Sequence, residues 1–215
     1  MGAIGTLTLS GGISADAAVE ALAGFAAGDA RVVVVEAGAD AGPGAWPGER
    51  VRWLWRDYPL PVVFAFEGRL EGAGAAFALG CDIRVCGEAA AMELDGESMD
   101  GLTAERARTL LGLEAGNAIP TRLTAGEALE AGLVSRVGPA GSAAEVARGA
   151  AEAVAARGPI ATRLAKEAVW RGLDQPLEQA LRFETDLTLL LQATKDRAEG
   201  VRAFLEKRPP DFTGE

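Results

Sequence analysis

One stretch, residues 60–86 (LPVVFAFEGRLEGAGAAFALGCDIRVC), constrains the fold of this chain more than any other. The apolar run at 61–66 predicts a buried strand, because turn-forming residues flank it on both sides. Glycines follow at 68, 72 and 74, then small apolar residues at 75–80 that favour a tightly packed helix, and a short strand at 83–86. A glycine turn that feeds a helix leaves backbone N–H groups free, and with the helix dipole these suit an anion or a developing oxyanion.

The rest of the chain alternates in the manner of a parallel sheet with helical crossovers. Strands are predicted at 4–9 and 31–36, helices at 15–27 and 49–56, and a glycine- and proline-rich loop at 38–48. Further on, residues 87–102 are expected to form an acidic loop, and Thr103 is expected to cap a helix at 104–111. The remaining predicted elements are helices at 125–131, 142–157 and 160–171 and a strand at 133–137. The segment 176–204 is amphipathic, and its apolar face is too extensive for a lone surface helix. We expect it to pack on a neighbouring subunit or to cover the active site.

Composition excludes several classes of function. A net charge of −10 argues against binding to nucleic acid or to an anionic membrane, because both need a basic face. No apolar run approaches the roughly 20 residues that span a bilayer, and the first residues lack the features of a signal peptide. The two cysteines, Cys81 and Cys86, give neither a disulfide framework nor a metal-binding spacing, so we expect both near the core of a cytoplasmic protein without a metal. The absence of histidine excludes Ser-His-Asp and Cys-His mechanisms.

Three segments together resemble the enoyl-CoA hydratase/isomerase (crotonase) family. The central segment resembles the family's P-V-I-A-A-V-N-G-x-A-x-G-G-G…C-D-I motif, through Pro61-Val62, the three glycines and Cys81-Asp82-Ile83. Residues 131–137 (AGLVSRV) resemble its A-G-L-V-x-x-V, and residues 199–208 (EGVRAFLEKR) resemble its E-G-x-x-A-F-x-E-K-R. The resemblance implies an α/β fold, a crotonase-like ββα superhelix core at 1–140 with a helical trimerisation region at 141–215.

The resemblance also implies chemistry on an acyl-CoA thioester, whose carbonyl oxygen is held by two backbone N–H groups in an oxyanion hole. One donor falls on Ala73, with Gly68, Gly72 and Gly74 around it as substrate-binding positions. The other falls near Ala45 and Trp46, and a rival register places it within residues 37–40. No cofactor is implied beyond the coenzyme A of the substrate, and a homotrimer or a dimer of trimers is expected.

Of the two catalytic glutamates that the family resemblance implies, this sequence retains one. The first position holds Ala76, which cannot transfer a proton, whereas Glu97 fits the second through its E-x-x-x-G-L spacing. A single glutamate suits a double-bond isomerase better than a hydratase, because one base can shuttle a proton between two carbons. The alternative is a non-catalytic accessory subunit of a biosynthetic assembly. Glu67 and Glu71 beside the glycine turn either face solvent or supply new acid–base groups.

Overall fold

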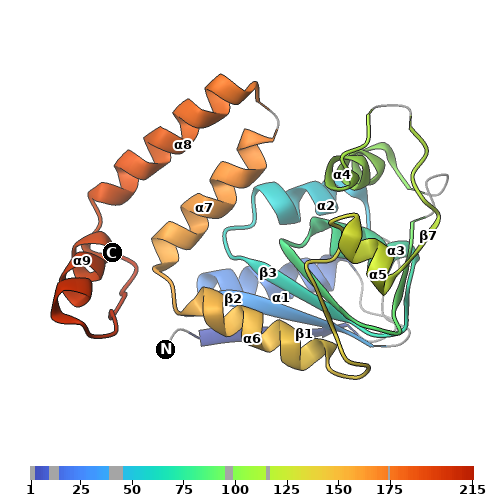
Figure 1. Ribbon diagram of the computed structural model, residues 1–215, viewed down its shortest axis with the longest axis horizontal. Coiled ribbons are helices and arrows are strands. Elements are labelled where there is room, and N and C mark those ends of the chain that lie inside the picture. Colours follow the sequence, from blue (N-terminus) through green and yellow to red (C-terminus); the bar gives the residue numbers. More distant parts are fainter. Residues whose placement is uncertain (1–2, 10–14, 39–45, 95–98, 115–116, 174) are drawn as a thin grey trace.

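The fold is built on a five-stranded parallel sheet in the order β1-β2-β3-β5-β8 (Figure 1). The computed structural model describes residues 3–9, 15–38, 46–94, 99–114, 117–173 and 175–215. The strands are β1 (Ala3–Leu9), β2 (Ala30–Ala37), β3 (Val62–Phe66), β5 (Ile83–Gly87) and β8 (Arg136–Gly138). Helices link the first three strands as crossovers, so the predicted parallel α/β arrangement is confirmed.

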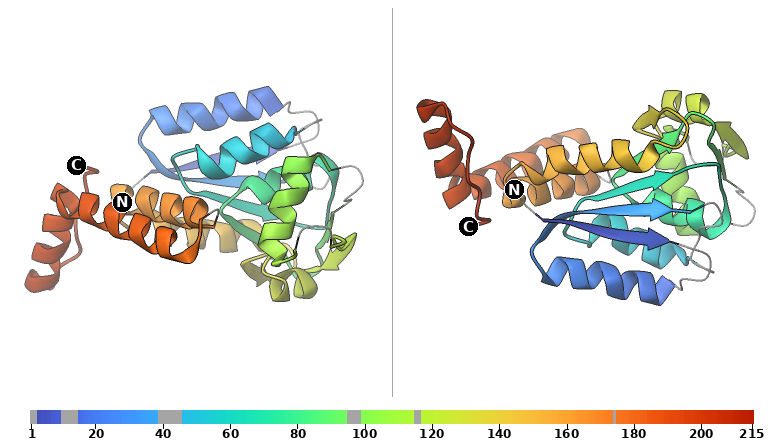
Figure 2. Two further views of the ribbon diagram at one scale, coloured as in Figure 1. Left: turned by 90° about the horizontal axis from the view of Figure 1, so that it is seen from above. Right: turned by 90° about the horizontal axis from the view of Figure 1, so that it is seen from below.

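Both faces of the sheet are covered by helices, which explains why its central strands are apolar throughout. Along β2, Val32 and Val34 point into a cluster with the alanine-rich helix α6 (Ala143–Ala155). Val33 and Val35 point into the larger cluster on the opposite face. That face carries α1 (Ala15–Ala27), α2 (Gly48–Arg56) and α3 (Gly72–Gly80), and Figure 2 shows α1 and α6 on opposite sides of the sheet.

A second, three-stranded sheet lies beside the first and corrects one sequence-based expectation. It consists of β4 (Arg69–Leu70), β6 (Ala91–Glu93) and β7 (Arg122–Thr124) in the order β4-β6-β7. The segment 87–102 was expected to be an acidic loop throughout, but β6 lies within it. The strand forms because Met92, 1% exposed, sits in the core while pairing with Leu70 on one side and Leu123 on the other.

Helix boundaries also differ from the sequence-based expectation at several points. Helix α4 (Gly101–Leu111) begins before Thr103, because the Asp100 side chain caps it by accepting the Thr103 N–H at 3.0 Å. Helix α3 begins at Gly72 rather than at Ala75. The helix α5 (Ala125–Glu130) matches the helix predicted at 125–131, and it carries a capping box with Thr124 as its N-cap. The strand expected at 133–137 begins later than expected and ends one residue beyond that range, at Arg136–Gly138.

The C-terminal segment consists of three helices that project to one side of the sheet (Figure 1). They are α7 (Pro159–Gly172), α8 (Leu177–Gln192) and α9 (Lys195–Glu206). The single long segment expected at 176–204 is therefore two helices. It breaks because the Thr194 hydroxyl accepts the Arg197 N–H at 3.1 Å and starts a new helix.

These helices keep several large apolar side chains exposed, among them Leu173, Leu177, Leu181, Leu189, Leu190, Phe204 and Leu205. In the part of the chain that the structure describes, every helix is too short or too polar to cross a membrane. The division of the chain at residue 140 stays a prediction. Helix α6, which follows that position, packs on the sheet, whereas α7 to α9 lie beyond it.

Candidate active site

The first turn of α3 forms the predicted oxyanion position. Glu71 is the N-cap of this helix, and Gly72 has a positive φ of 53°, which L side chains rarely adopt. The first amide that bonds back within the turn is that of Ala75, to the Glu71 carbonyl at 3.3 Å. Ala73 lies before it, and no residue that the structure describes accepts a hydrogen bond from its N–H. The amide of Ala73 is thus one of the free donors that every helix start provides.

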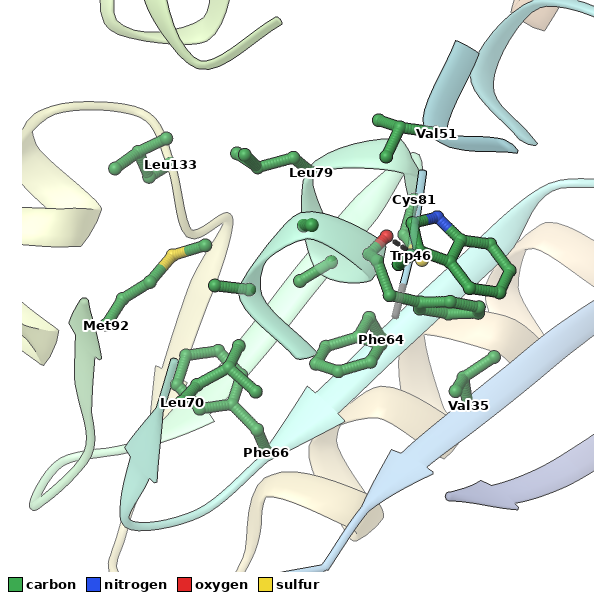
Figure 3. Packing of buried hydrophobic residues seen from close by; sticks show 14 of the residues in the cluster. Val35, Trp46, Val51, Phe64, Phe66, Leu70, Leu79, Cys81, Met92 and Leu133 are labelled. Atoms are coloured by element: carbon green, nitrogen blue, oxygen red, sulfur yellow. Dashed lines mark hydrogen bonds between the residues drawn. The ribbon is translucent and has the colours of Figure 1, made fainter. Parts of the chain in front are cut away.

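Helix α3 is held in place by small buried residues and by one aromatic ring. All of its residues from Gly74 to Gly80 are buried. The ring of Phe77 lies 4.5 Å from that of Trp46 and 5.8 Å from that of Phe64, measured between centroids. Figure 3 shows Trp46 in the same cluster as Val35 and Phe64. The tryptophan is 5% exposed, and it brings the chain just before α2 against the helix that carries Ala73.

The structure therefore brings together the segments of the two predicted donors, Ala73 and Trp46. Within the rival register at 37–40, the Gly38 N–H is used by the sheet and donates to the Leu9 carbonyl at 3.1 Å. Ala39, Asp40 and Ala45 lie outside the described residues. The indole Nε1 of Trp46 is buried and has no hydrogen-bond partner within the described part of the chain.

Of the two positions that the resemblance assigns to acid–base residues, the structure describes Ala76 but not Glu97. Ala76 lies on α3 and is 8% exposed, so an apolar methyl group stands at the position where the resemblance predicts the first carboxylate. Glu97 falls within 95–98, outside the described residues, and its role stays a prediction. Of the predicted substrate-binding glycines, Gly72 and Gly74 lie in the first turn of α3. Gly68 lies between β3 and β4, and its carbonyl accepts the Ala91 N–H at 2.8 Å.

The two glutamates beside the glycine turn are engaged in contacts within the chain. The Glu67 carboxylate accepts the Ala143 N–H at 2.9 Å, at the start of α6, so it stabilises a helix start. Glu71 is 58% exposed and pairs with Arg69 at 2.7 Å. Arg69 also contacts Glu93 at 2.5 Å. Of the two roles left open for these glutamates, solvent exposure fits Glu71, and Glu67 holds a structural role.

Asp100 and Gly48 form a contact that the sequence did not single out. The Asp100 carboxylate accepts hydrogen bonds from the N–H of Gly48, at the start of α2, and from the N–H of Thr103 in α4. Burial raises the pKa of this carboxyl, but hydrogen bonds from Thr103, Gly48 and Leu102 outweigh burial and lower the pKa overall. In the sequence Asp100 is one of the acidic residues of the segment 87–102, and only the proximity of the two helix starts reveals its role. Within the described ranges, no three His, Cys, Asp or Glu side chains gather closely enough to hold a metal ion.

A model of the enoyl-CoA hydratase/isomerase family matches residues 24–215. The chain belongs to the enoyl-CoA hydratase/isomerase family. It is 33% identical to the (E)-benzylidenesuccinyl-CoA hydratase of Thauera aromatica over 75% of this chain and 64% of that protein. It is 35% identical to the 2,3-dehydroadipyl-CoA hydratase of Escherichia coli over 75% of this chain and 67% of that protein. A probable enoyl-CoA hydratase of Arabidopsis thaliana is 33% identical, over 72% of this chain and 54% of that protein.

This family member therefore spans between 54% and 67% of the length of these three relatives. Solved structures cover the chain more fully. An enoyl-CoA hydratase subunit from Geobacillus kaustophilus superposes with a TM-score of 0.82 at 29% identity, covering 100% of this chain and 96% of that one. An enoyl-CoA hydratase from Bacillus anthracis gives 0.75 at 29% identity, covering 97% of this chain and 91% of that one. The predicted crotonase fold is confirmed.

Proposed function

We propose that this chain acts on an acyl-CoA thioester and stabilises its enolate through the backbone N–H groups of Ala73 and Trp46. The observation that carries the proposal is the free first turn of α3, with Trp46 packed against the same helix through Phe77. Negative charge that develops on the thioester oxygen would meet the Ala73 donor and the positive end of the helix dipole. A donor of this kind contributes about 2.7–4 kcal/mol to transition-state stabilisation.

The reaction that fits best moves a double bond. Ala76 offers no carboxylate, so the pair of glutamates that adds water across a double bond is incomplete. With Glu97 as a single base, the carboxylate removes a proton from the carbon next to the thioester carbonyl of a 3-enoyl-CoA. The electron pair then passes into the enolate, and the protonated glutamate returns the proton to the far end of the system, giving a 2-enoyl-CoA. The reaction removes one proton and returns one, with no net oxidation or reduction, so it needs no cofactor beyond the coenzyme A that forms part of the substrate.

The negative charge of the protein does not prevent an anionic ligand from reaching this turn. Glu71 lies two residues before Ala73 in the chain, and its charge is countered by Arg69 at 2.7 Å. Glu67 points instead to the start of α6. Because both are solvated or satisfied within the chain, their repulsion of a thioester at Ala73 is reduced.

A second candidate function is that of a non-catalytic accessory subunit of a biosynthetic assembly. The observation in its favour is Ala76, a buried methyl group where the family places a proton-transferring carboxylate. In that case the scaffold persists without turnover, and binding to a partner enzyme replaces catalysis.

A turnover experiment decides between the two. Purified protein is incubated with 3-hexenoyl-CoA and, separately, with crotonyl-CoA, and the products are followed by chromatography. We expect isomerisation of the 3-enoyl substrate, little hydration of crotonyl-CoA, and at least a hundredfold loss of kcat in Glu97→Gln. Hydration as fast as isomerisation would contradict the single-base mechanism. A folded protein that converts neither substrate would overturn the enzyme proposal in favour of the accessory subunit.

We also propose that the protein works in the cytoplasm as a homo-oligomer, a trimer or a dimer of trimers. The support for self-association is the exposed apolar surface of α7 to α9 described above. Light scattering coupled to size-exclusion chromatography gives the mass directly, and a monomeric mass at micromolar concentration would overturn this part of the proposal.

A further inference from the structure

We propose that Asp100 is a positioning residue that holds the Trp46 amide at the oxyanion hole. One carboxylate oxygen of Asp100 accepts the N–H of Gly48, and the other accepts the N–H of Thr103 at 3.0 Å. The same side chain therefore joins the starts of α2 and α4. The two residues in contact, Gly48 and Asp100, are 52 positions apart in the sequence. Both helix starts favour a negative charge, so an ionised carboxylate suits this place better than a neutral side chain.

Gly48 and the Asp100 carboxylate are complementary in shape as well as in charge. A Cβ atom added to Gly48 would lie 1.9 Å from the Asp100 Oδ1 atom. No real side chain tolerates such an approach, so only glycine at position 48 leaves room for the carboxylate. The pKa of Asp100 is lowered from its ordinary acidic value, so the carboxylate is ionised at neutral pH and its charge is available to both helix starts.

The bridge reaches the candidate active site over a short stretch of chain. Only Pro47 separates Gly48 from Trp46, and its backbone is extended, with φ of −60° and ψ of 145°. The Trp46 ring is fixed at the other side by Phe77 of α3, at 4.5 Å. With Gly48 held by Asp100 and the indole held by Phe77, the peptide N–H of Trp46 has little freedom to move away from the first turn of α3. This inference rests on the proposed function.

Three variants separate a role of Asp100 as a helix cap from a role in positioning the Trp46 amide. In Asp100→Ser the hydroxyl still caps α4, but one short oxygen cannot serve Gly48 as well. Gly48→Ala breaks the same bridge from the other side, because its Cβ displaces the carboxylate of an otherwise native Asp100. Thr124→Ala removes the cap of α5, where the capping box is also formed, and serves as the control for a lost helix cap elsewhere in the chain.

The experiment compares these variants in isomerase turnover and in the binding of acetoacetyl-CoA, whose enolate has its own ultraviolet absorption. Because a displacement of about 1 Å near the reacting atoms costs up to about a hundredfold in rate, we expect kcat to fall by about 10- to 100-fold in Asp100→Ser and in Gly48→Ala. KM should change little, and the bound enolate band should weaken. The double variant should be no worse than the poorer single one, since both changes break one contact. Thr124→Ala should keep kcat and the enolate band.

Several results would overturn the inference. Wild-type kcat and enolate band in both Asp100→Ser and Gly48→Ala would show that Asp100 only caps a helix, while the proposed function stands. A wild-type protein that neither binds nor converts an acyl-CoA would remove the proposed function and the positioning role together. The Gly48 amide proton is a readout that does not depend on activity. Its NMR signal should lie downfield and move upfield in Asp100→Ser, and an unchanged signal would refute the bridge itself.

Discussion

The carboxylate of Asp82 lies 2.8 Å from the ammonium group of Lys166, and this pair fastens helix α7 to the sheet. The same carboxylate accepts the indole N–H of Trp170 and the backbone N–H of Val62, both at 2.8 Å. Lys166 in turn donates to the Leu60 carbonyl at 2.9 Å. Asp82 belongs to the Cys-Asp-Ile motif, so this part of the family resemblance has a structural role in joining the C-terminal helices to the core.

Removing Asp82 should therefore destabilise the protein strongly. The Lys166 side chain is 7% exposed, and Asp82→Ala would leave its charge unpaired, at a cost of about 3–5 kcal/mol. Urea unfolding followed by tryptophan fluorescence measures the change in the free energy of unfolding. The control is Glu178→Ala, which removes the exposed pair with Arg182 and should cost less than about 1 kcal/mol. Equal small effects of both substitutions would contradict a buried anchoring role for Asp82.

The positive φ of Gly72 leads to a second prediction. Gly72→Ala meets no neighbouring atom, so its cost comes from the backbone alone, about 1–2 kcal/mol for a left-handed residue. Gly72→Asn should cost less, because asparagine tolerates this conformation better. Gly101→Ala is the matched control, since that residue also opens a helix with free space around it but without a positive φ, and it should be neutral or stabilising. Thermal unfolding compares the three, and a neutral Gly72→Ala would refute the left-handed start of α3.

The two thiols should be unreactive in the native protein. Burial raises the pKa of Cys86 to about 11, with a further contribution from Glu67, and burial also raises the pKa of Cys81. Both side chains are buried and free. At pH 8 almost no thiolate forms, so a thiol reagent such as Ellman's should react with neither cysteine until the protein is denatured. Rapid modification of one thiol per chain under native conditions would contradict the buried position of that cysteine.

Glu199 should titrate well below an ordinary glutamate. Hydrogen bonds from Arg208 and from the Asp211 N–H lower its pKa from 4.5 to about 2. Because the folded-state pKa is depressed, the contact stabilises the fold fully above pH 4.5 and loses this effect as the pH falls to about 2. An NMR titration of the Glu199 carboxyl should give the low value, and Arg208→Gln should return it toward 4.5. A wild-type pKa near 4.5 would show that Arg208 does not hold this carboxylate in solution.

The central part of the fold follows from local patterns in the sequence. Local patterns predicted β1, β2, β3 and β5 closely, because β2 and β3 are rich in apolar residues, β1 alternates apolar and polar residues, and β5 follows the small apolar helix as a short, mostly apolar stretch. The three-residue strands β6 and β7 were missed, because they are too short to show periodicity and form only by pairing with distant partners. The break between α8 and α9 was missed as well, since the apolar pattern continues across it and the cap depends on one threonine.

The candidate site was predictable only where it depends on the backbone. The glycines at 72 and 74 indicated a free helix start, and the structure places Ala73 there. The hydrogen bond between Asp100 and Gly48 could not be predicted from the sequence, because it depends on the approach of two helix starts that are far apart in the chain. The role of Glu67 was left open by the sequence, because only the tertiary fold brings the start of α6 to it.

Calorimetric titration of the purified protein with crotonyl-CoA and acetyl-CoA tests the central claim most directly. Micromolar binding is expected, and it should weaken at least tenfold in Ala73→Pro, which removes the proposed donor at a helix position where proline is tolerated. Circular dichroism and the unfolding temperature establish that the variant is folded. Unchanged affinity in a folded Ala73→Pro would place the thioester elsewhere, and a folded wild-type protein that binds no acyl-CoA would contradict the account as a whole.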